Sequence, residues 1–537
     1  MSLSIERSFT GRWQMDSGVQ RRQSNRKLQT LAAAALLALP AVGFAQSASW
    51  TSPSSGVWSG TTNWTPNTPP NAGGVATFNL ATAGTTVTLD TAVTLGGLNI
   101  LTDNYTLAAG AGSITLNAGA SVNVGTGNTG TIGSALRIAT STLSSNFSKD
   151  GSGTLVLNGS NNIGGNIQIN AGAVRIDAAS ALNGVSTVAA NGGVLLLNNI
   201  GATPTAFLGL GVSGGPGGAV ESIAGNNTWN GLWLLINQAS VGVDSGTLTL
   251  NGGVFDGNQP GFNGLTKVGA GTFRVDNVRL IGPLTINGGT VQVKPDGTPN
   301  GVSKLTGPTG GLTIAGGATP TATLDLTDND LVLDYTSTSP ISTVRAQIRN
   351  AYNGGLWNQP GISTSLGGAI ISGPPNVIGK TAALGYAEAS ALGNPSTFNG
   401  QSVDSTTVIV KYTLAGDSDL DGDADGVDIG NWATNFTGEL GGTGSQVWSQ
   451  GDWDYDGDVD GVDAGIWAQN FTGELGGGGL GSIVITQPIA PGAAAILEGM
   501  GITVVPEPVS ASVLMIGGLG LLARRRKNFS DRRRINN

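Results

Sequence analysis

The chain has 537 residues, a formal net charge of −9, and neither histidine nor cysteine. Without histidine, Ser-His-Asp and Cys-His catalysis and histidine-ligated zinc are excluded; without cysteine, disulfides are excluded. Residues 46–505 carry 12 basic and 30 acidic side chains, so a nucleic acid is an unfavourable partner. The 88 glycines, the 5% aromatic content and the β-branched tracts predict many short strands joined by tight turns.

Residues 1–45 have the pattern of a secretory signal peptide. Basic side chains precede the apolar run Leu31–Leu39, and Gly43–Ala45 offers small residues at the −3 and −1 positions of a cleavage site. The apolar run is too short to span the roughly 30 Å of a bilayer core, which favours cleavage over a membrane anchor. We therefore expect an exported chain.

Residues 46–323 repeat short strands in which apolar and polar residues alternate, and most strands end in Asn or Asp before a glycine-bearing turn. One such unit cannot bury its apolar face alone, whereas stacked units can, so the pattern predicts a β-solenoid. Asn side chains at the turns can stack into ladders along it. The clearest predicted strands are 86–90, 113–117, 154–158, 166–170, 247–251, 283–287 and 311–315.

Two longer units, residues 149–177 and 267–294, share the order Lys-x-Gly-x-Gly-Thr, strand, gap, Ile-Asn-x-Gly and a further strand. These units resemble the autotransporter-associated β-strand repeat of passenger-type surface proteins. The resemblance implies that the solenoid is a right-handed β-helix. No autotransporter pore domain is visible in the sequence, so the export route of that family does not transfer.

The solenoid region contains two kinds of candidate glycan site. Trp50, Trp58 and Trp64 at its start form either a sugar-stacking platform or an aromatic cap that closes the first coil, and we favour the cap. Hydrolysis or elimination of a polysaccharide would need paired acids or a basic residue in a cleft. The acidic residues of this region are sparse, and the sequence does not show whether any two converge.

Residues 324–413 change in character, and we expect them to form a small β or α+β capping subdomain. Residues 324–336 have the pattern of a strand pair, 342–352 of a helix, and 405–415 of a strong strand. Four acidic residues are interpreted as turn and solvent-facing strand positions in preference to a further cation site: Asp325, Asp328, Asp330 and Asp334.

Residues 414–476 contain two 12-residue acidic loops, 417–428 and 452–463, with Asp at loop positions 1, 3, 5, 7, 9 and 12 and Gly at position 6. Such a loop can wrap the about six to eight oxygen ligands of Ca²⁺ round one point, with position 7 ligating through its backbone carbonyl. Without a cation the carboxylates would repel one another. The sequence predicts two calcium ions, with the ligand residues Asp417, Asp419, Asp421, Asp423, Asp425, Asp428, Asp452, Asp454, Asp456, Asp458, Asp460 and Asp463.

A helical pattern follows each loop, and residues 425–442 match residues 460–477 at 15 of 18 positions. The duplicated loop–helix unit resembles a type I dockerin, which implies calcium binding and a docking role. Cellulosomal dockerins carry hydroxyl residues at loop positions 10 and 11 for cohesin recognition, whereas this chain has Gly426–Val427 and Gly461–Val462. Metal binding therefore carries over, and a cellulosomal cohesin partner does not. Four aromatic residues are expected to pack the two units together: Trp432, Phe436, Trp467 and Phe471.

Residues 477–504 are rich in Gly, Ala and Pro and are interpreted as a spacer. Residues 505–537 begin with Val-Pro-Glu-Pro and continue with the apolar run Val509–Ala523 and the basic cluster Arg524–Lys527. This order resembles a PEP-CTERM sorting signal, which implies an exosortase-type sorting enzyme and a transient membrane segment. A simple C-terminal anchor is the alternative.

Together these patterns predict a mainly β chain with a right-handed β-solenoid, a small capping subdomain and a dockerin-like calcium module. We expect an exported, non-catalytic protein of the cell envelope, outer surface or extracellular matrix, with a calcium-stabilised docking or adhesion module. The alternative is a surface-tethered polysaccharide hydrolase or lyase that this module positions. Besides calcium and the sorting enzyme, the candidate partners are a cohesin-like or other surface protein and a polysaccharide.

Overall fold

The computed structural model describes most of residues 44–505. Almost all of the expected signal peptide, 1–45, and sorting signal, 505–537, lies outside the described residues, so both remain predictions. Within the described part of the chain, no helix has the length and apolar character needed to cross a membrane. Between 44 and 505 the structure leaves out residues 82–83, 103, 134–135, 139–145, 204, 212–216, 256–263, 299–300, 371–378, 440–443 and 474–482.

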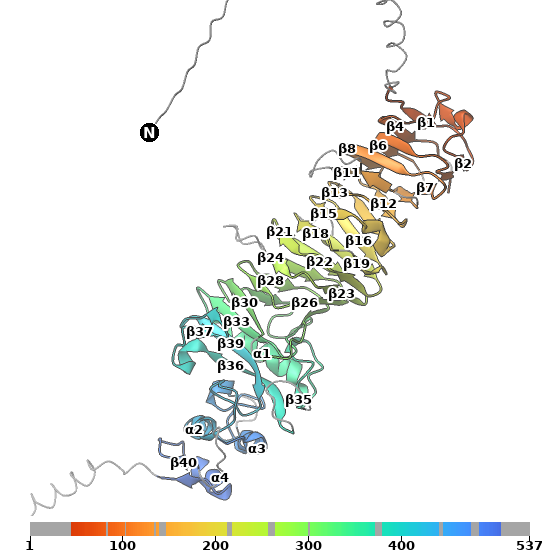
Figure 1. The fold of residues 1–537 in the computed structure, drawn as a ribbon. Helices are drawn as coiled ribbons and strands as arrows, with labels where there is room; N and C mark the ends of the chain where they lie inside the picture. Colours follow the sequence, from red (N-terminus) through yellow and green to blue (C-terminus); the bar gives the residue numbers. More distant parts are fainter. Residues whose placement is uncertain are drawn as a thin grey trace, which may run out of the picture. The chain divides into compact units, whose positions relative to one another are not determined.

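Residues 48–335 form a β-solenoid of about 11 turns (Figure 1). Strands of successive turns pair in parallel and in register, as Thr154–Leu157 does with Ala173–Ile176. Successive side chains of a strand point to opposite faces, so one set fills the interior while the other faces solvent. Gly165–Ile169 shows this alternation between buried and half-buried residues. The predicted mainly β fold with an N-terminal solenoid is confirmed.

Two sheets run along most of the solenoid, and the predicted strands lie in them and in a third sheet. Among the described residues the first sheet contains β1 (Ala48–Trp50), β3 (Trp64–Thr65), β4 (Gly74–Phe78), β6 (Val93–Ile100), β8 (Ile114–Val124), β10 (Leu136–Ile138), β11 (Asn146–Asp150), β13 (Gly165–Ile169), β15 (Val185–Ala190), β18 (Phe207–Leu210), β21 (Trp233–Leu235) and β24 (Val254–Phe255). The second contains β2 (Gly56–Val57), β5 (Thr86–Thr88), β7 (Tyr105–Ala108), β9 (Thr129–Ile132), β12 (Thr154–Leu157), β14 (Ala173–Ile176), β16 (Val194–Asn198), β19 (Val220–Ala224), β22 (Ala239–Val243), β25 (Leu265–Val268), β28 (Leu284–Ile286) and β31 (Leu312–Ile314).

The later turns add a third sheet, and a fourth sheet closes the last turns. The third contains β17 (Gly201–Ala202), β20 (Asn227–Trp229), β23 (Thr247–Leu250), β26 (Thr272–Val275), β29 (Thr290–Val293), β32 (Thr323–Asp325) and β34 (Gly361–Ser363). The fourth contains β27 (Arg279–Leu280), β30 (Val302–Gly307), β33 (Asp330–Tyr335), β35 (Gly368–Ala369), β36 (Thr381–Glu388) and β39 (Thr407–Leu414), and β37 (Thr397–Phe398) pairs separately with β38 (Gln401–Ser402).

The lysine of each Lys-x-Gly-x-Gly-Thr repeat is fully buried and donates hydrogen bonds to the backbone carbonyls around it. The Lys149 ammonium donates to the carbonyl oxygens of Asp150 (2.9 Å), Gly151 (2.7 Å) and Ala171 (3.2 Å), the last of which belongs to the next turn. Lys267 repeats this arrangement with three carbonyl oxygens at 2.8, 2.8 and 3.2 Å. Burial lowers the pKa of both ammonium groups to about 8. The repeat therefore encodes a carbonyl cage that joins neighbouring turns.

Trp50, Trp58 and Trp64 form an aromatic cap at the start of the solenoid, as favoured from the sequence. All three side chains are fully buried. The rings of Trp50 and Trp64 meet edge to face with centroids 5.1 Å apart, and those of Trp58 and Trp64 lie 4.8 Å apart. The indole N–H of Trp64 donates to the carbonyl of Trp58 at 2.8 Å. None of these rings presents an open face on which a sugar could stack.

The solenoid continues past residue 323, where we expected it to end. Residues 324–336 do not form a strand pair: β32 joins the third sheet beside β29, and β33 joins the fourth beside β30. Each of the two strands forms its backbone hydrogen bonds by pairing in parallel with a strand of the preceding turn, so they need not pair with each other. β39 then pairs antiparallel with β33 and β36, which covers the open edge.

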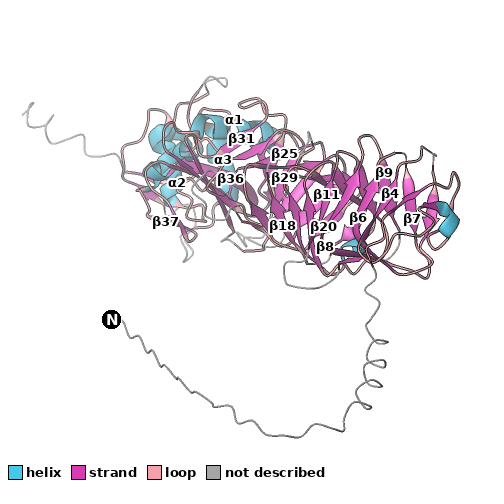
Figure 2. Cartoon of the chain, turned by 90° about the horizontal axis from the view of Figure 1, so that it is seen from above, coloured by secondary structure: helices cyan, strands magenta, loops and turns pink. Residues whose placement is uncertain are grey.

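Four α-helices follow the solenoid strands in the described sequence, and Figure 2 labels the first three of them. The predicted helix at 342–352 is α1 (Ile341–Tyr352), which ends where Asn353 adopts a left-handed conformation (φ 44°). The helical patterns after the acidic loops are α2 (Gly426–Asn435) and α3 (Gly461–Asn470).

The described part of the expected spacer, 483–504, is folded. It contains β40 (Val484–Ile485), α4 (Ala493–Gly499) and β41 (Thr503–Val504). The N–H of Ala490 donates to the carbonyl of Ala433 in α2 at 2.7 Å, and Ile485, Leu497 and Ile502 are buried. Burial of these apolar side chains explains why a composition typical of a linker folds onto the module here.

Candidate metal centre

The two acidic loops have the same backbone conformation. Loop position 4 is left-handed in both, at Leu420 (φ 62°) and Tyr455 (φ 64°), although neither residue is glycine. Loop position 6 also has a positive φ, 110° at Gly422 and 99° at Gly457. A side chain is strongly disfavoured in that conformation, which explains the glycine of the pattern. The sequence repeat is thus a structural repeat.

All twelve predicted ligands lie in groups of acidic side chains that could hold a metal ion. In each group, one carboxylate oxygen per residue lies within 4.8 Å of the others. In both loops position 12 groups with positions 7 and 9, and in the second loop it also groups with positions 1 and 3. The groups are Asp417, Asp419 and Asp421; Asp423, Asp425 and Asp428; Asp452, Asp454 and Asp463; Asp458, Asp460 and Asp463; and Glu439, Asp456 and Asp458.

The aspartate at loop position 12 also joins each loop to its helix. The carboxylate of Asp428 accepts from the N–H groups of Ser418 and Asp425, each at 2.7 Å. Asp463 accepts in the same way from Trp453 (2.7 Å) and Asp460 (2.9 Å). Position 12 is the third residue of the helix, and its acid completes a capping box with the residue at position 9. This second role fits the short side chain of aspartate where EF-hand loops have glutamate.

Burial and mutual repulsion disfavour the charged forms of these carboxylates. Burial, followed by the charges of neighbouring aspartates, raises the pKa of Asp428 and of Asp463 to about 8. Burial is also the main cause that raises the pKa of Asp417 and Asp452 to about 7 and that of Asp454 to about 6. A bound cation reverses this balance, because it favours the ionised form of every surrounding carboxylate.

Loop position 1 differs between the two units. In the first, Asp417 accepts from the N–H groups of Asp421 (3.1 Å) and Gly422 (3.0 Å) and from the Thr413 hydroxyl. The Lys411 ammonium lies 3.9 Å from the same carboxylate.

In the second unit, Asp452 is fully buried, and among the described residues neither of its carboxylate oxygens has a hydrogen-bond partner of normal geometry. The N–H of Gly457 and the charge of Arg345 favour its ionised form without satisfying its oxygens. A buried unsatisfied carboxylate is costly, so this residue fits a bound cation best.

The two units hold each other through reciprocal contacts. The indole N–H of Trp432 in α2 donates to the carbonyl of Asp460 at 2.8 Å, and that of Trp467 in α3 donates to Asp425 at 2.9 Å. Both acceptors are at loop position 9 of the other unit. The two phenylalanines lie against the tryptophan of their own helix, with centroids 5.1 Å apart in Trp432–Phe436 and in Trp467–Phe471. The tryptophans therefore make these cross-unit hydrogen bonds, and each phenylalanine, at the C-cap of its helix, lies against the tryptophan of the same unit.

Three charged residues near the loops were missed in the sequence. Glu439 lies beyond the first loop and groups with Asp456 and Asp458 of the second, which no spacing rule within a 12-residue loop could indicate. Lys411 comes from β39, and its ammonium donates to the carbonyl of Leu420 at 2.6 Å. Arg345 of α1 donates to the carbonyls of Gly444 and Gln446, each at 3.1 Å. These contacts tie the module to the preceding subdomain.

The four aspartates at the end of the solenoid do not gather into a metal-binding group among the described residues. Asp325 accepts from the Gln292 amide (2.7 Å) and Asp328 from the N–H of Gly297 (3.0 Å). Asp330 accepts from the N–H of Tyr412 (2.9 Å), and Asp334 pairs with Lys304 (3.2 Å). Asp325, Asp328 and Asp330 are buried instead of facing solvent, because each bonds to groups on another segment of chain.

Comparison of the chain with protein-family models, with curated proteins and with solved structures finds no match. What the module can do therefore follows from its own residues: two equivalent acidic loops, each followed by a helix whose tryptophan contacts the other loop.

Proposed function

We propose that the chain is an exported, non-catalytic protein of the cell surface or extracellular matrix, with residues 414–476 as a calcium-stabilised docking or adhesion module. The observation that carries the proposal is the buried carboxylate of Asp452, which finds no hydrogen-bond partner in the described part of the chain and groups with Asp454 and Asp463. Three negatively charged carboxylates can lie together in a buried site when a cation neutralises them.

Calcium is the cation that this donor set favours. The side chains of the acidic groups offer carboxylate oxygens, the donors of hard cations, with no nitrogen or sulfur ligand. Mg²⁺ needs a near-ideal octahedron and keeps several waters, whereas Ca²⁺ accepts the larger and less regular oxygen set of a 12-residue loop. The twelve aspartates named from the sequence would hold two ions, one in each loop. The ions would neutralise the loops and fix them on their helices.

The docking role is supported by two exposed valines. Val427 and Val462 occupy loop position 11 in the first turns of α2 and α3, and their exposed fractions are 54% and 55%. Other apolar residues of the module, such as Ile429 and Ala464, are buried. We propose that this valine pair contacts a surface protein, with the solenoid as the stalk. Export and sorting rest on the patterns of residues 1–45 and 505–537.

Calcium titration of the full chain tests the metal part of the proposal. Isothermal titration calorimetry of the EDTA-treated chain should count two calcium ions, and calcium should raise the melting temperature through preferential binding to the folded state. Magnesium at the same concentration should have a smaller effect. A chain that binds fewer than two calcium ions, or melts identically in calcium and in EDTA, contradicts the proposal.

Capture of a partner tests the docking part. The immobilised chain should retain a specific surface or secreted protein in calcium and release it in EGTA. Replacement of both valines, Val427→Glu and Val462→Glu, should abolish capture while calcium stoichiometry stays at two. Capture that survives both substitutions excludes the valine pair as the contact surface. If nothing is retained in calcium, the ions are internal staples and the docking role is wrong.

A further inference from the structure

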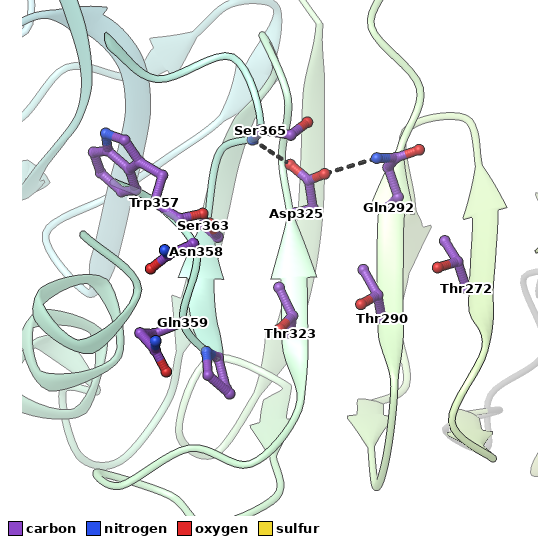
Figure 3. Close-up of a pocket in the computed structure, with 11 residues that line it drawn as sticks. Thr272, Thr290, Gln292, Thr323, Asp325, Trp357, Asn358, Gln359, Ser363 and Ser365 are labelled. Carbon is purple, nitrogen blue, oxygen red and sulfur yellow. Dashed lines mark hydrogen bonds between the residues drawn. The ribbon is translucent and has the colours of Figure 1, made fainter. Parts of the chain in front are cut away.

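A polar groove of about 370 Å³ lies on the outer face of the third sheet, where β26, β29, β32 and β34 run side by side (Figure 3). Its size is within the range of small-molecule sites, about 300–1,000 Å³. Its lining consists mostly of hydroxyl and amide side chains, together with one carboxylate, one indole and one proline: Thr272, Thr290, Gln292, Thr323, Asp325, Trp357, Asn358, Gln359, Pro360, Ser363 and Ser365. We propose that this groove binds a neutral polysaccharide chain. The proposal does not depend on the calcium module.

The floor of the groove repeats at the spacing of the strands. Thr272, Thr290 and Thr323 are in register on β26, β29 and β32, so their hydroxyls form a row that crosses the sheet. Neighbouring strands are about 4.8 Å apart, which is close to the length of one sugar residue in an extended chain. A polymer with a short repeat can therefore meet an equivalent hydroxyl at each step. Threonine hydroxyls both donate and accept, as sugar hydroxyls require.

A second row holds the fixed polar groups of the groove. Gln292 and Asp325 are in register, and the Gln292 amide nitrogen donates to the Asp325 carboxylate at 2.7 Å. This bond leaves the amide oxygen of Gln292 directed away from Asp325 (Figure 3). The next residue in the row is Arg274, which lies beside the groove and not in its lining, and whose buried Nε has no hydrogen-bond partner among the described residues. An acceptor and an unsatisfied donor therefore stand next to each other in the row.

One wall of the groove is a segment between α1 and β34 that is held by its own amides. The Asn350 amide donates to the carbonyl of Pro360 at 2.8 Å, and the Asn353 amide donates to Asn358 at 2.9 Å. Gln359 also lines a neighbouring hollow of about 490 Å³, which includes Asn350 and Asn353. The two hollows share this residue and extend the polar surface, which suits a chain of several sugar residues better than a single small molecule.

The chemistry of the groove favours binding over cleavage. Among the described residues that line it, Asp325 is the only carboxylate. This side chain is 6% exposed and accepts from Gln292 and from the N–H groups of Thr327 and Ser365. Glycoside hydrolysis uses a pair of carboxylates on either side of the scissile bond. Asp325 is therefore a positioning residue for the Gln292 amide, and the groove lacks the second acid.

The ligand should also be uncharged. Among the described residues that line the groove itself there is no lysine or arginine, although Arg274 continues the second row beside it and Arg349 lines the neighbouring hollow, and residues 46–505 carry a net charge of −18. That charge disfavours acidic polysaccharides. Trp357 lines the groove, but its exposed fraction is 8% and its ring packs on Tyr352 and Tyr455. Recognition should therefore rest on hydrogen bonds instead of stacking on an open aromatic face.

Calorimetric titration of the full chain tests the proposal with four probes: cellohexaose, laminarihexaose and mannohexaose as neutral oligosaccharides, and hexagalacturonate as the acidic one. At least one neutral probe should bind, and Thr290→Trp, which fills the middle of the row, should weaken that binding at least tenfold. Thr247→Trp is the matched control, because Thr247 pairs with Thr272 on the adjacent β23 but lies outside the groove.

A melting temperature for each variant shows whether it folds. If Thr290→Trp does not fold, the double variant Asn358→Ala and Gln359→Ala replaces it, because both side chains are exposed on the wall of the groove. The proposal is overturned if no neutral probe binds, if hexagalacturonate binds more tightly than the neutral probes, or if Thr247→Trp weakens binding as much as Thr290→Trp does.

Discussion

The indole N–H of Trp467 donates a 2.9 Å hydrogen bond to the backbone carbonyl of Asp425, which belongs to the other loop–helix unit. Trp432 makes the equivalent contact with Asp460 at 2.8 Å. The helix after each acidic loop therefore positions the other loop. Asp425 and Asp460 are also the N-caps of α2 and α3. A change that displaces the tryptophan of one unit should therefore destabilise the first turn of the helix in the other unit.

Removing either indole donor should destabilise the module. Trp467→Phe and Trp432→Phe each remove the indole N–H that a carbonyl of the other unit accepts from, and each should cost about 1–3 kcal/mol in addition to the loss of ring volume. Urea denaturation in excess calcium, followed by the remaining tryptophan fluorescence, measures the effect. Trp453→Phe is the control, since Trp453 is equally buried but its indole nitrogen has no hydrogen-bond partner. Equal costs for all three variants would show that the cross-unit bonds contribute nothing.

The effect of Asp452→Asn on stability should reverse between EDTA and calcium. Without calcium it removes a buried carboxylate that has no hydrogen-bond partner, so the urea midpoint in EDTA should rise. With calcium it removes a ligand, so the midpoint should fall below that of the unmodified chain, and calorimetry should count one ion instead of two. Asp404→Asn, at an exposed turn, should leave the calcium response unchanged. A midpoint that moves in the same direction in EDTA and in calcium would argue against a metal role for Asp452.

The two lysines enclosed by carbonyl oxygens should stabilise the fold far more than a solvent-exposed positive charge would. Lys149→Met and Lys267→Met keep an unbranched apolar stem but remove the ammonium that three carbonyl oxygens accept from. We expect each to cost about 2–4 kcal/mol. Lys294→Met is the control, because this ammonium is partly exposed and water can replace it. A cost at Lys149 or Lys267 no larger than that at Lys294 would show that the cage is not stabilising.

Local patterns were sufficient to predict many of the strands of the solenoid and the helices α1, α2 and α3. Alternation and turn glycines gave the strand at 154–158, because a solenoid strand packs on a copy of itself in the next turn. The helical patterns after the acidic loops likewise located α2 and α3, whose capping boxes at Asp425 and Asp460 are seen only in the structure.

Contacts between distant segments could not be predicted in this way. The third carbonyl around Lys149 comes from Ala171, and Glu439 reaches a group in the other unit. The sequence around residues 483–504 has the composition of a linker, and only its packing on α2 explains why it folds. The groove has no sequence signature either, since the register of β26, β29 and β32 creates its threonine row.

The buried carboxylate of Asp330 should make stability fall as pH rises. Burial raises its pKa from 3.8 to about 7, although Tyr412, Lys411 and Asn399 favour the charged form. In that pH range the folded chain holds a proton that the unfolded chain has lost, so the free energy of unfolding decreases between about pH 4 and pH 7. Asp330→Asn removes the titration while the Asn oxygen still accepts from the N–H of Tyr412.

The stability of Asp330→Asn relative to the unmodified chain should therefore improve by on the order of 2 kcal/mol between about pH 5 and pH 7. Urea midpoints at several pH values, all in excess calcium, measure this difference. Asp90→Asn is the matched control: a hydrogen bond from Ser59 lowers the pKa of Asp90 from 3.8, so its titration lies below this range. A difference between Asp330→Asn and the unmodified chain that is constant with pH would mean that Asp330 is ionised throughout, with its hydrogen bonds outweighing its burial.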